Sequence, residues 1–248
     1  MENTRKLRSA DIPAHVASQL RGALFPGANV VLGLSGGLDS VCLLHVLAEL
    51  AMPLRFSLRA VHVNHGISQH AAQWTDFCRG LCLRLGVSLS IEMVNVGAYR
   101  GLGPEGAARA ARWSALRLHQ ADFLALAQHL DDQAETLLLQ LLRGAGPAGL
   151  AGMAANAFDA RASAHPVRVL RPMLELNRVD ILEFATKRGL EWVEDESNVD
   201  VAMDRNFLRH RLIPAMVERF PGATKRISRS AGILGEAAQL LDELGRQD

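Results

Sequence analysis

A polar turn between two apolar segments, at residues 34–40, constrains the fold of this chain more than any other feature of its sequence. The segment before the turn has the length and composition of a buried strand, and the segment after it those of a buried helix. Gly36 and Gly37 let the backbone approach a ligand closely, and Ser35 and Ser40 add hydroxyl groups. Because the N–H groups that open the helix point at the same spot, the turn predicts a binding site for a phosphate group.

The turn matches neither of two common phosphate-binding patterns, G-x-x-x-x-G-K-S/T and G-x-G-x-x-G. Asp39 lies beside the glycines instead. A carboxylate next to a triphosphate is explained if Mg²⁺ lies between them, so the turn also predicts a magnesium ion. The structural alternative is a tight turn in which Ser40 caps the helix.

Length and composition are those of an ordinary globular protein. The chain has 248 residues, 49% of them hydrophobic and 21% charged, which argues against disorder. Its apolar runs are too short to span a membrane and its first residues lack the apolar core of a secretory signal, so we expect a cytoplasmic protein without membrane contact. Cys78 and Cys82 are four apart with no second pair, and we expect buried apolar cysteines rather than metal ligands.

Segments of strand and helix character alternate along the chain. Strands are expected at 30–34, 58–63, 87–94 and 123–127, and helices at 40–50, 70–85, 105–120 and 131–142. This alternation predicts an α/β fold, a parallel twisted sheet with helices on both faces, that binds ligands at the carboxyl ends of its strands. Further on, we expect a Gly- and Pro-rich loop at 143–153, a strand at 167–171, and helices at 177–188, from 204, and at 222–248, the last without a partner domain behind it.

Polar residues also follow the fourth expected strand. Asp132 and Glu135 are three apart and share a helix face, and His129 precedes them. Since the strand end brings them toward the same edge of the sheet as the first turn, we expect them to bind a metal or a cationic substrate. Acids that only complement the helix dipole are the alternative.

Two further groups of residues are open to a functional and a structural interpretation. Arg109 and Arg112 can reach a phosphate or a polarised carbonyl, or can form surface pairs with Glu105. His62 and His65 lack a third zinc ligand, so we expect them to line a pocket or to be satisfied structural histidines.

Positive charge gathers in residues 205–229, although the whole chain carries a net charge of only +1. This segment has seven cations and one acid, Glu218, for a local charge of +6. Arg205, Asn206 and Arg209 suit contacts with phosphate and ribose. A phosphate-rich partner and a simple solvated helix face both explain the segment.

Together these motifs resemble the tRNA(Ile)-lysidine synthases, members of the N-type ATP pyrophosphatase, or PP-loop, superfamily. The resemblance covers roughly residues 28 to 215 and rests on Ser35-Gly-Gly-Leu-Asp-Ser40, His62-Val-Asn-His-Gly66, Glu105-x-x-Ala-Arg109-x-x-Arg112, Gln128-His-Leu-Asp-Asp-Gln-Ala-Glu-Thr136, Arg143-Gly-x-Gly-Pro-x-Gly-Leu150, and Glu194-Asp-Glu-Ser-Asn198 followed by Asp204-Arg-Asn-Phe-Leu-Arg209. The first motif marks only the superfamily. The His129-Leu-Asp-Asp132 and Glu194-Asp-Glu-Ser-Asn198 runs are specific to the lysidine branch.

The resemblance implies a Rossmann-like PP-loop ATPase fold with a small, mostly helical C-terminal extension, and a two-step ligation. ATP adenylates the C2 oxygen of the wobble cytidine of tRNA(Ile) with a CAU anticodon, and pyrophosphate leaves. The ε-amine of free L-lysine then displaces AMP to form lysidine. The expected cofactors are ATP and Mg²⁺, and the expected partners are this tRNA and lysine.

The resemblance also implies roles for individual residues. The pyrophosphate part of ATP would be bound by Ser35, Gly36, Gly37, Leu38, Asp39 and Ser40. Mg²⁺ would be held by Asp39 and Asp132, and charge on the activated base or phosphate stabilised by Arg109 or Arg112. The lysine ammonium would be bound by Asp132 and Glu135, with His129 as candidate base, and the tRNA or substrate contacted by Arg205, Asn206 and Arg209.

The expected organisation is an N-terminal helix or lead-in at 1–27, a catalytic domain at 28–215, and at 216–248 a helical extension or linker to tRNA-binding domains. Many family members carry such domains, so we expect either a short family form or a shortened chain, whose ATP site would survive while tRNA affinity and turnover fall. The oligomeric state stays open, a homodimer included. The alternatives are a PP-loop tRNA thiolation enzyme, which would need paired C-x-x-C cysteines, and a non-catalytic nucleotide- or RNA-binding module.

Overall fold

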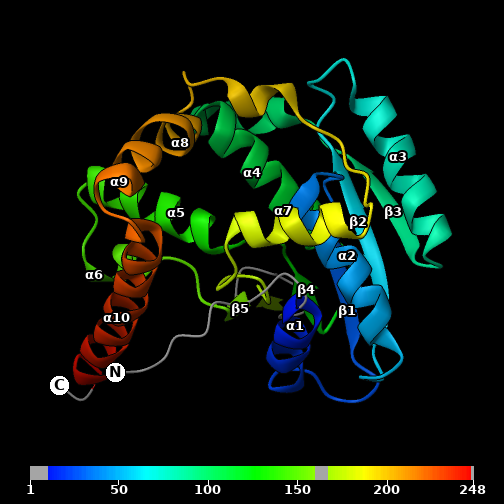
Figure 1. Ribbon diagram of the computed structural model, residues 1–248, viewed down its shortest axis with the longest axis horizontal. Helices are drawn as coiled ribbons and strands as arrows, with labels where there is room; N and C mark the ends of the chain where they lie inside the picture. Colours follow the sequence, from blue (N-terminus) through cyan, green and yellow to red (C-terminus); the bar gives the residue numbers. More distant parts are fainter. Residues whose placement is uncertain (1–10, 160–166, 247–248) are drawn as a thin grey trace. The chain divides into compact units, whose positions relative to one another are not determined.

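The computed structural model describes residues 11–159 and 167–246, and its elements form two compact units (Figure 1). The sheet unit comprises the chain up to Ala127 together with Asn156–Met173 and Val179–Glu194. The helical unit comprises Gln128–Ala155, Leu174–Arg178 and the residues from Asp195 onward. The domain boundaries expected at residues 27 and 215 stay predictions.

The sheet unit is built on six strands in the order β3-β2-β1-β4-β6-β5. Their bounds are β1 Asn29–Gly33, β2 Ser57–Asn64, β3 Ser88–Met93, β4 Phe123–Ala125, β5 Asn156–Asp159 and β6 Val167–Leu170. All neighbours are parallel except β5 and β6, which are antiparallel. The five strands expected from the sequence are confirmed, whereas β5 was not predicted, because four residues at a sheet edge carry little periodic signal.

Helices cover both faces of this sheet. Their bounds are α1 Ile12–Arg21, α2 Leu38–Ala51, α3 Ala71–Arg84, the 3₁₀ segment η2 Val96–Leu102, α4 Gly103–Leu116 and α7 Arg178–Lys187. The chain passes from β1 through α2 to β2 and through α3 to β3, and so moves toward the β3 edge of the sheet. From β3 it passes through α4 to β4, on the other side of β1. Since such crossovers are right-handed, α2 and α3 lie on one face and α4 on the other, which confirms the predicted fold.

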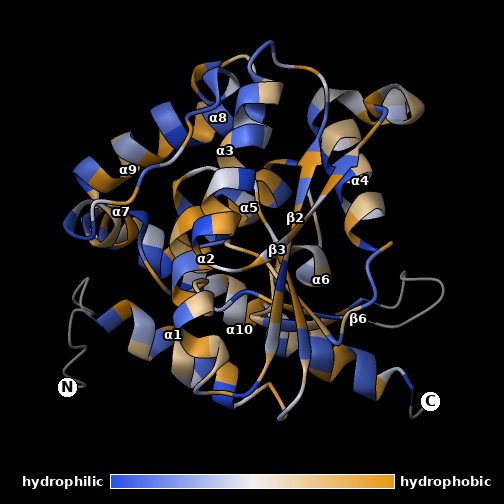
Figure 2. Ribbon diagram, turned by 90° about the vertical axis from the view of Figure 1, so that its right-hand side faces the viewer, coloured by the Kyte–Doolittle hydropathy of each residue, from blue (hydrophilic) through white to orange (hydrophobic). Residues whose placement is uncertain are grey.

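Packing agrees with this assignment of faces. Val31 of β1 packs in one buried cluster with Leu116 of α4. On the other face α2 is buried along most of its length, and it is among the more hydrophobic helices in Figure 2. Cys42 of α2 lies 3.8 Å from the carbonyl oxygen of Ile181 (Sγ to O), so α7 shares this face.

The helical unit has a small core of its own. Its elements are α5 Leu130–Leu142, α6 Pro147–Leu150, the 3₁₀ segment η3 Glu196–Val199, α8 Asp204–Phe207, the π-helical turn η4 Leu208–Leu212, α9 Ile213–Arg219 and α10 Ala223–Leu244. Leu138, Leu208 and Ile213 form the buried centre, with Ile227 of α10 packed against it. The last helix, expected without a partner domain behind it, packs on α5 and α6 of its own unit.

The segment after Asp204, expected as one helix, is divided by a π-helical turn before α9. Pro214 in the first turn of α9 has no N–H, so the regular hydrogen-bond ladder cannot run through it unchanged. Over the part of the chain that the structure describes, no helix joins the length and the apolar character needed to cross a bilayer.

Candidate active site

The Ser35–Ser40 loop connects β1 to α2 and folds around its own hydroxyl groups. The N–H of Gly36 donates to Ser40 Oγ at 3.1 Å, and that of Gly37 to Ser35 Oγ at 3.3 Å. The two hydroxyl oxygens lie 3.0 Å apart, and Ser40 Oγ also donates to the Gly37 carbonyl at 3.0 Å. The loop amides therefore already converge on two oxygens, the arrangement that phosphate oxygens require.

Gly36 packs against its surroundings more tightly than a side chain would allow. Its φ is +89°, and a Cβ atom placed there would lie 3.0 Å from Val193 Cγ2 and 3.1 Å from Cys78 Sγ. The N–H of Val193 donates to the Gly36 carbonyl at 3.0 Å, which fixes that neighbour. The loop conformation thus depends on glycine at this position.

A buried histidine contacts the residue that precedes the loop. His62 is 4% exposed, and its Nδ1 lies 2.9 Å from the Leu34 carbonyl oxygen and 3.6 Å from Cys78 Sγ. Burial lowers the pKa of His62, so the ring is neutral and Nδ1 donates to Leu34. Burial also raises the pKa of the Cys78 thiol to about 12. The structural role expected for His62, and the burial of Cys78 and Cys82, are confirmed.

Three arginines belong to the sheet unit's candidate site, one of which the sequence analysis missed. Arg109 and Arg112 are exposed on α4. Arg171 directly follows β6 and is only 7% exposed. Burial and the nearby charge of Arg109 together lower the pKa of Arg171 to about 10. Arg171 therefore lies at the carboxyl end of a parallel strand, where ligands bind in such sheets, and close enough to Arg109 to feel its charge. A cation directly between an apolar strand and a proline was the signal that could have found it.

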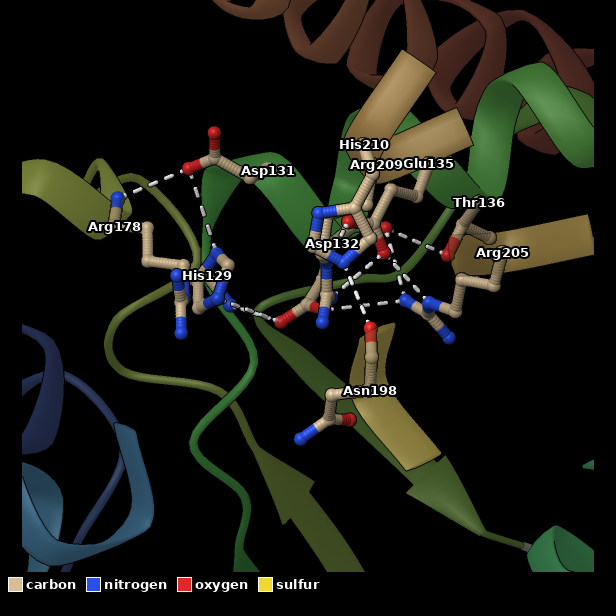
Figure 3. A network of polar contacts seen from close by, with 10 residues as sticks. All are labelled: His129, Asp131, Asp132, Glu135, Thr136, Arg178, Asn198, Arg205, Arg209 and His210. Carbon is tan, nitrogen blue, oxygen red and sulfur yellow. Dashed lines mark hydrogen bonds and ion pairs between the residues drawn. The ribbon is translucent and has the colours of Figure 1, made fainter. Parts of the chain in front are cut away.

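In the helical unit, His129 lies between two carboxylates at the start of α5 (Figure 3). Its side chain is 1% exposed, with Nε2 3.4 Å from Asp132 Oδ2 and Nδ1 3.6 Å from Asp131 Oδ2. The backbone N–H of His129 donates to Asp132 Oδ2 at 3.1 Å, and that of Arg178 donates to Asp131 Oδ2 at 3.0 Å. These bonds fix the first turn of the helix.

Two arginines bind the carboxylates that the sequence analysis selected (Figure 3). Glu135 is 1% exposed, and its oxygens accept hydrogen bonds from Arg205 Nε at 2.6 Å and from Arg209 Nε at 2.7 Å. Asp132 Oδ1 lies 3.3 Å from a terminal nitrogen of Arg205 and 3.2 Å from one of Arg209. We call these four residues the acid–arginine network; its two negative and two positive charges balance.

The charges around this network shift the pKa values of Asp132 and Arg205. Burial raises the pKa of Asp132, but the charges of His129, Arg205 and Arg209 outweigh burial, and the pKa falls below its usual value. Burial lowers the pKa of Arg205, but Asp132 and Glu135 outweigh it, and the pKa is raised. Both shifts favour the charged forms of Asp132 and Arg205, which are paired with each other.

Asn206 supports the neighbouring backbone rather than this network. Its side-chain amide, 7% exposed, donates to the carbonyl oxygens of Ser197 at 2.8 Å and Asp200 at 2.9 Å. His210 Nε2 lies 2.7 Å from the Asn198 carbonyl oxygen. The polar stretch around Asn198 is thus held against α8 and η4.

The Gly- and Pro-rich loop at 143–153 is tightly folded and contains α6. The side-chain amide of Gln133 binds both backbone groups of Met153, accepting from N at 2.7 Å and donating to O at 2.8 Å. Gly152 has φ +64°, and a Cβ there would lie 2.7 Å from Gln133 Oε1. Gln133, which the sequence analysis did not select, therefore determines how this loop ends.

Comparison with known proteins decides the family of the chain. The sequence model of the PP-loop domain family matches residues 12–216. The chain belongs to this family. It is 42% identical over 248 residues to the tRNA(Ile)-lysidine synthase of Nitrosomonas europaea, covering 100% of this chain and 54% of that protein. It is 46% identical over 226 residues to the tRNA(Ile)-lysidine synthase of Methylococcus capsulatus, covering 90% and 50%.

This PP-loop chain therefore spans about half the length of the curated relatives it matches. Among solved structures it resembles the U34-tRNA thiolase NcsA from Methanococcus maripaludis, with a TM-score of 0.75 at 21% identity, over 92% of this chain and 79% of that one. At this level of identity the likeness shows the fold alone.

The predicted site residues of the PP-loop chain divide between its two units. The sheet unit holds Ser35, Gly36, Gly37, Leu38, Asp39, Ser40, Arg109 and Arg112, and the helical unit holds His129, Asp132, Glu135, Arg205, Asn206 and Arg209. Asp132 and Glu135 share one helix face, as their spacing predicts, and the structure brings Arg205 and Arg209 onto them. The chemical roles assigned to these residues stay predictions.

Proposed function

We propose that this chain takes part in an ATP-dependent ligation that forms lysidine on tRNA(Ile). ATP would adenylate the C2 oxygen of the wobble cytidine in a CAU anticodon with release of pyrophosphate, and the ε-amine of free L-lysine would then displace AMP. The observation that carries this proposal is the 42–46% identity, along nearly all of this chain, to proteins named tRNA(Ile)-lysidine synthase.

The geometry of the Ser35–Ser40 loop supports the first step. The amides of Gly36 and Gly37 donate to serine hydroxyl oxygens at 3.1 and 3.3 Å. A phosphate group of ATP would take over these amides and leave the hydroxyls of Ser35 and Ser40 as additional donors. Donors fixed before the reaction stabilise the charge that collects on the leaving pyrophosphate.

We assign the expected magnesium ligand to Asp39. Its carboxylate lies in the first turn of α2, next to the loop, and carboxylate oxygens are the ligands that Mg²⁺ prefers. Asp132 Oδ1, in contrast, is within 3.3 Å of two guanidinium groups, and Oδ2 accepts the His129 N–H. A bound Mg²⁺ would neutralise charge on the phosphates of ATP.

The arginines of the sheet unit fit the role of anion stabilisers. Arg109 and Arg112 are exposed on α4, where their side chains can change conformation to contact a substrate. Arg171 is only 7% exposed and directly follows β6. We propose that Arg171 and Arg109 together bind a phosphate or the adenylated intermediate, because guanidinium groups bind phosphate oxygens through paired N–H donors.

The acid–arginine network suggests how lysine would bind. Glu135 is 1% exposed and bound by both arginines, whereas the Asp132 side chain is 15% exposed. We therefore assign the positioning of Arg205 and Arg209 to Glu135. The lysine ammonium would bind the more exposed Asp132 by displacing one guanidinium group from its Oδ1. In its neutral form, His129, whose Nε2 lies 3.4 Å from Asp132 Oδ2, is the candidate proton acceptor that would make the amine nucleophilic.

Exchange of labelled pyrophosphate into ATP, followed by incorporation of labelled lysine, tests the proposal. We expect exchange only when tRNA(Ile) with a CAU anticodon is present, and no exchange with the same tRNA carrying a different anticodon. Asp39→Ala should abolish exchange; unchanged lysine incorporation in that variant would contradict the metal assignment. No lysine incorporation by a protein of the relatives' full length that contains this chain would overturn the lysidine assignment.

A further inference from the structure

Four cations gather at the turn between α9 and α10 of the helical unit. Arg219 ends α9, Lys225 and Arg226 lie in the first turn of α10, and Arg229 follows one helical turn later. All four side chains are exposed. We call them the turn cluster. Glu218 is the one acidic residue among positions 205–229 of the sequence, so the local charge is strongly positive.

The helix geometry turns this cluster toward solvent. Ala223 and Ala231 are 6% and 0% exposed, and Ile227 between them packs on the core of the helical unit. At 3.6 residues per turn, Lys225 and Arg229 each lie about 160° around the helix from Ile227, and so point away from that core.

The remaining two cations extend the same surface across the turn. A terminal nitrogen of Arg226 donates to the Pro221 carbonyl at 2.9 Å, which bends this side chain back over the turn. The guanidinium carbon of Arg219 lies 5.4 Å from the ring centroid of Phe220. Phe220 itself is 56% exposed, so an aromatic ring lies on the surface among the cations.

The turn cluster differs from the acid–arginine network in how its charge is used. Arg205 and Arg209 are paired with Asp132 and Glu135. In contrast, no ion pair between residues that the structure describes includes a member of the turn cluster. Unpaired exposed cations attract an anionic partner, whereas paired ones are neutralised.

We propose that the turn cluster binds the phosphate backbone of an RNA, with Phe220 stacking on an exposed base. Guanidinium groups bind phosphates in a bidentate fashion, and three of the four cations are arginines. An accessible aromatic ring among cations is typical of single-stranded RNA recognition, because every base has a face on which such a ring can stack. The assignment of this RNA as tRNA rests on the proposed function; the RNA-binding surface itself does not.

The salt dependence of RNA binding tests the proposal on the whole chain. The probe is an unmodified tRNA transcript with a CAU anticodon, titrated at several salt concentrations. Each phosphate contact contributes about 0.7–0.9 to the slope of log K against log salt concentration. We expect Lys225→Gln with Arg229→Gln to lower the slope by about 1.4–1.8. Phe220→Leu should weaken binding several-fold and leave the slope unchanged, because stacking releases no counterions.

A matched control separates a local contact from loss of net charge. Arg79→Gln with Lys187→Gln removes the same charge from exposed positions on α3 and α7. The control should keep the wild-type slope. A slope that is unchanged in the turn-cluster variant, or reduced equally in the control, overturns the proposal, as does equal competition by polyglutamate of matched charge. Circular dichroism verifies that each variant is folded.

The two proposals fail separately. If the chain adenylates tRNA while the turn-cluster variant keeps the wild-type slope, the surface assignment is wrong and the proposed function stands. If the variant lowers the slope but pyrophosphate exchange does not depend on tRNA, the assignment of the RNA-binding surface stands and the proposed function is wrong.

Discussion

Gly36 is the residue at which the loop of the PP-loop chain tolerates least change. A side chain there would combine two costs, since its φ of +89° is unfavourable for other residues and its Cβ would press on Val193 and Cys78 at 3.0 and 3.1 Å. Gly27 has nearly the same φ, +85°, but no atom within 4 Å of a Cβ position. Comparing substitutions of the two glycines therefore separates the cost of backbone strain from the cost of close packing.

We expect Gly27→Ala to lower the free energy of unfolding by about 1 kcal/mol, from backbone strain alone. Gly36→Ala should cost about 2–3 kcal/mol, because Val193 or Cys78 must also shift. Urea unfolding measures both, and ATP affinity should fall in the Gly36 variant only. Equal losses of stability and unchanged ATP affinity in both variants would show that the contacts of Gly36 do not shape the site.

His62 should make stability depend on pH. Its pKa is lowered from 6.5 by burial, so below that pH the unfolded chain binds a proton that the folded ring does not. The contribution is therefore present above pH 6.5 and is lost as the pH falls through the folded pKa. His62→Asn keeps a donor for the Leu34 carbonyl but cannot titrate, and we expect a flatter profile of unfolding free energy between pH 7.5 and 5.5.

His45 is the control for this measurement. Its pKa is also lowered by burial, but it is only half-buried, so His45→Asn should flatten the profile less than His62→Asn. A profile that is unchanged in His62→Asn, or flattened more in the His45 variant, would mean that the buried ring beneath the loop is not the main titrating group.

At the scale of elements, Glu135 ties α5 to the segment formed by α8 and η4. It is 1% exposed and accepts from Arg205 and Arg209, 70 and 74 residues further along the chain. Removing one partner of a buried ion pair costs about 3–5 kcal/mol, but these arginines are 21% and 26% exposed, so water reduces the loss.

We expect Glu135→Gln to cost about 2 kcal/mol, since two guanidinium groups then share the single charge of Asp132. Faster amide exchange should appear in α8 and η4. Glu183→Gln removes a carboxylate of the same size from an exposed pair with Lys187 and should cost at most about 0.5 kcal/mol. Unchanged exchange in α8 and η4 would show that packing around Leu208, rather than charge, holds this segment.

The sequence predicts features that depend on local spacing, but not those that depend on contacts between distant segments. Spacing placed Asp132 and Glu135 on one face, because helical periodicity is local. Their pairing with Arg205 and Arg209 joins distant segments and has no local signal, so the sequence analysis assigned all four to ligands. Periodicity likewise predicted β1 to β4 but not β5, whose edge position follows from the whole sheet. Arg171 was missed because its place between an apolar strand and Pro172 is only a weak signal of burial, which the fold makes plain.

At the scale of the whole molecule, the net charge of +1 does not show that one group of charged residues is paired and another is exposed. The acid–arginine network balances its charges within the fold, and the turn cluster leaves its charges exposed. Substitutions in the first group therefore change stability, whereas substitutions in the second change the salt dependence of binding. Net charge alone would predict neither effect.

Ligand binding should couple the loop to the stability of the whole chain. ATP with Mg²⁺ at 100 times its dissociation constant should raise the free energy of unfolding by about 2.7 kcal/mol, and chelating the metal should remove most of this gain. Asp39→Asn should show the same small gain with or without Mg²⁺, because the loop amides remain. Asp76→Asn, at an exposed carboxylate on α3, should respond as the wild type does. Thermal unfolding measures all three proteins, and a metal-dependent gain that survives in Asp39→Asn would place the Mg²⁺ ligand elsewhere.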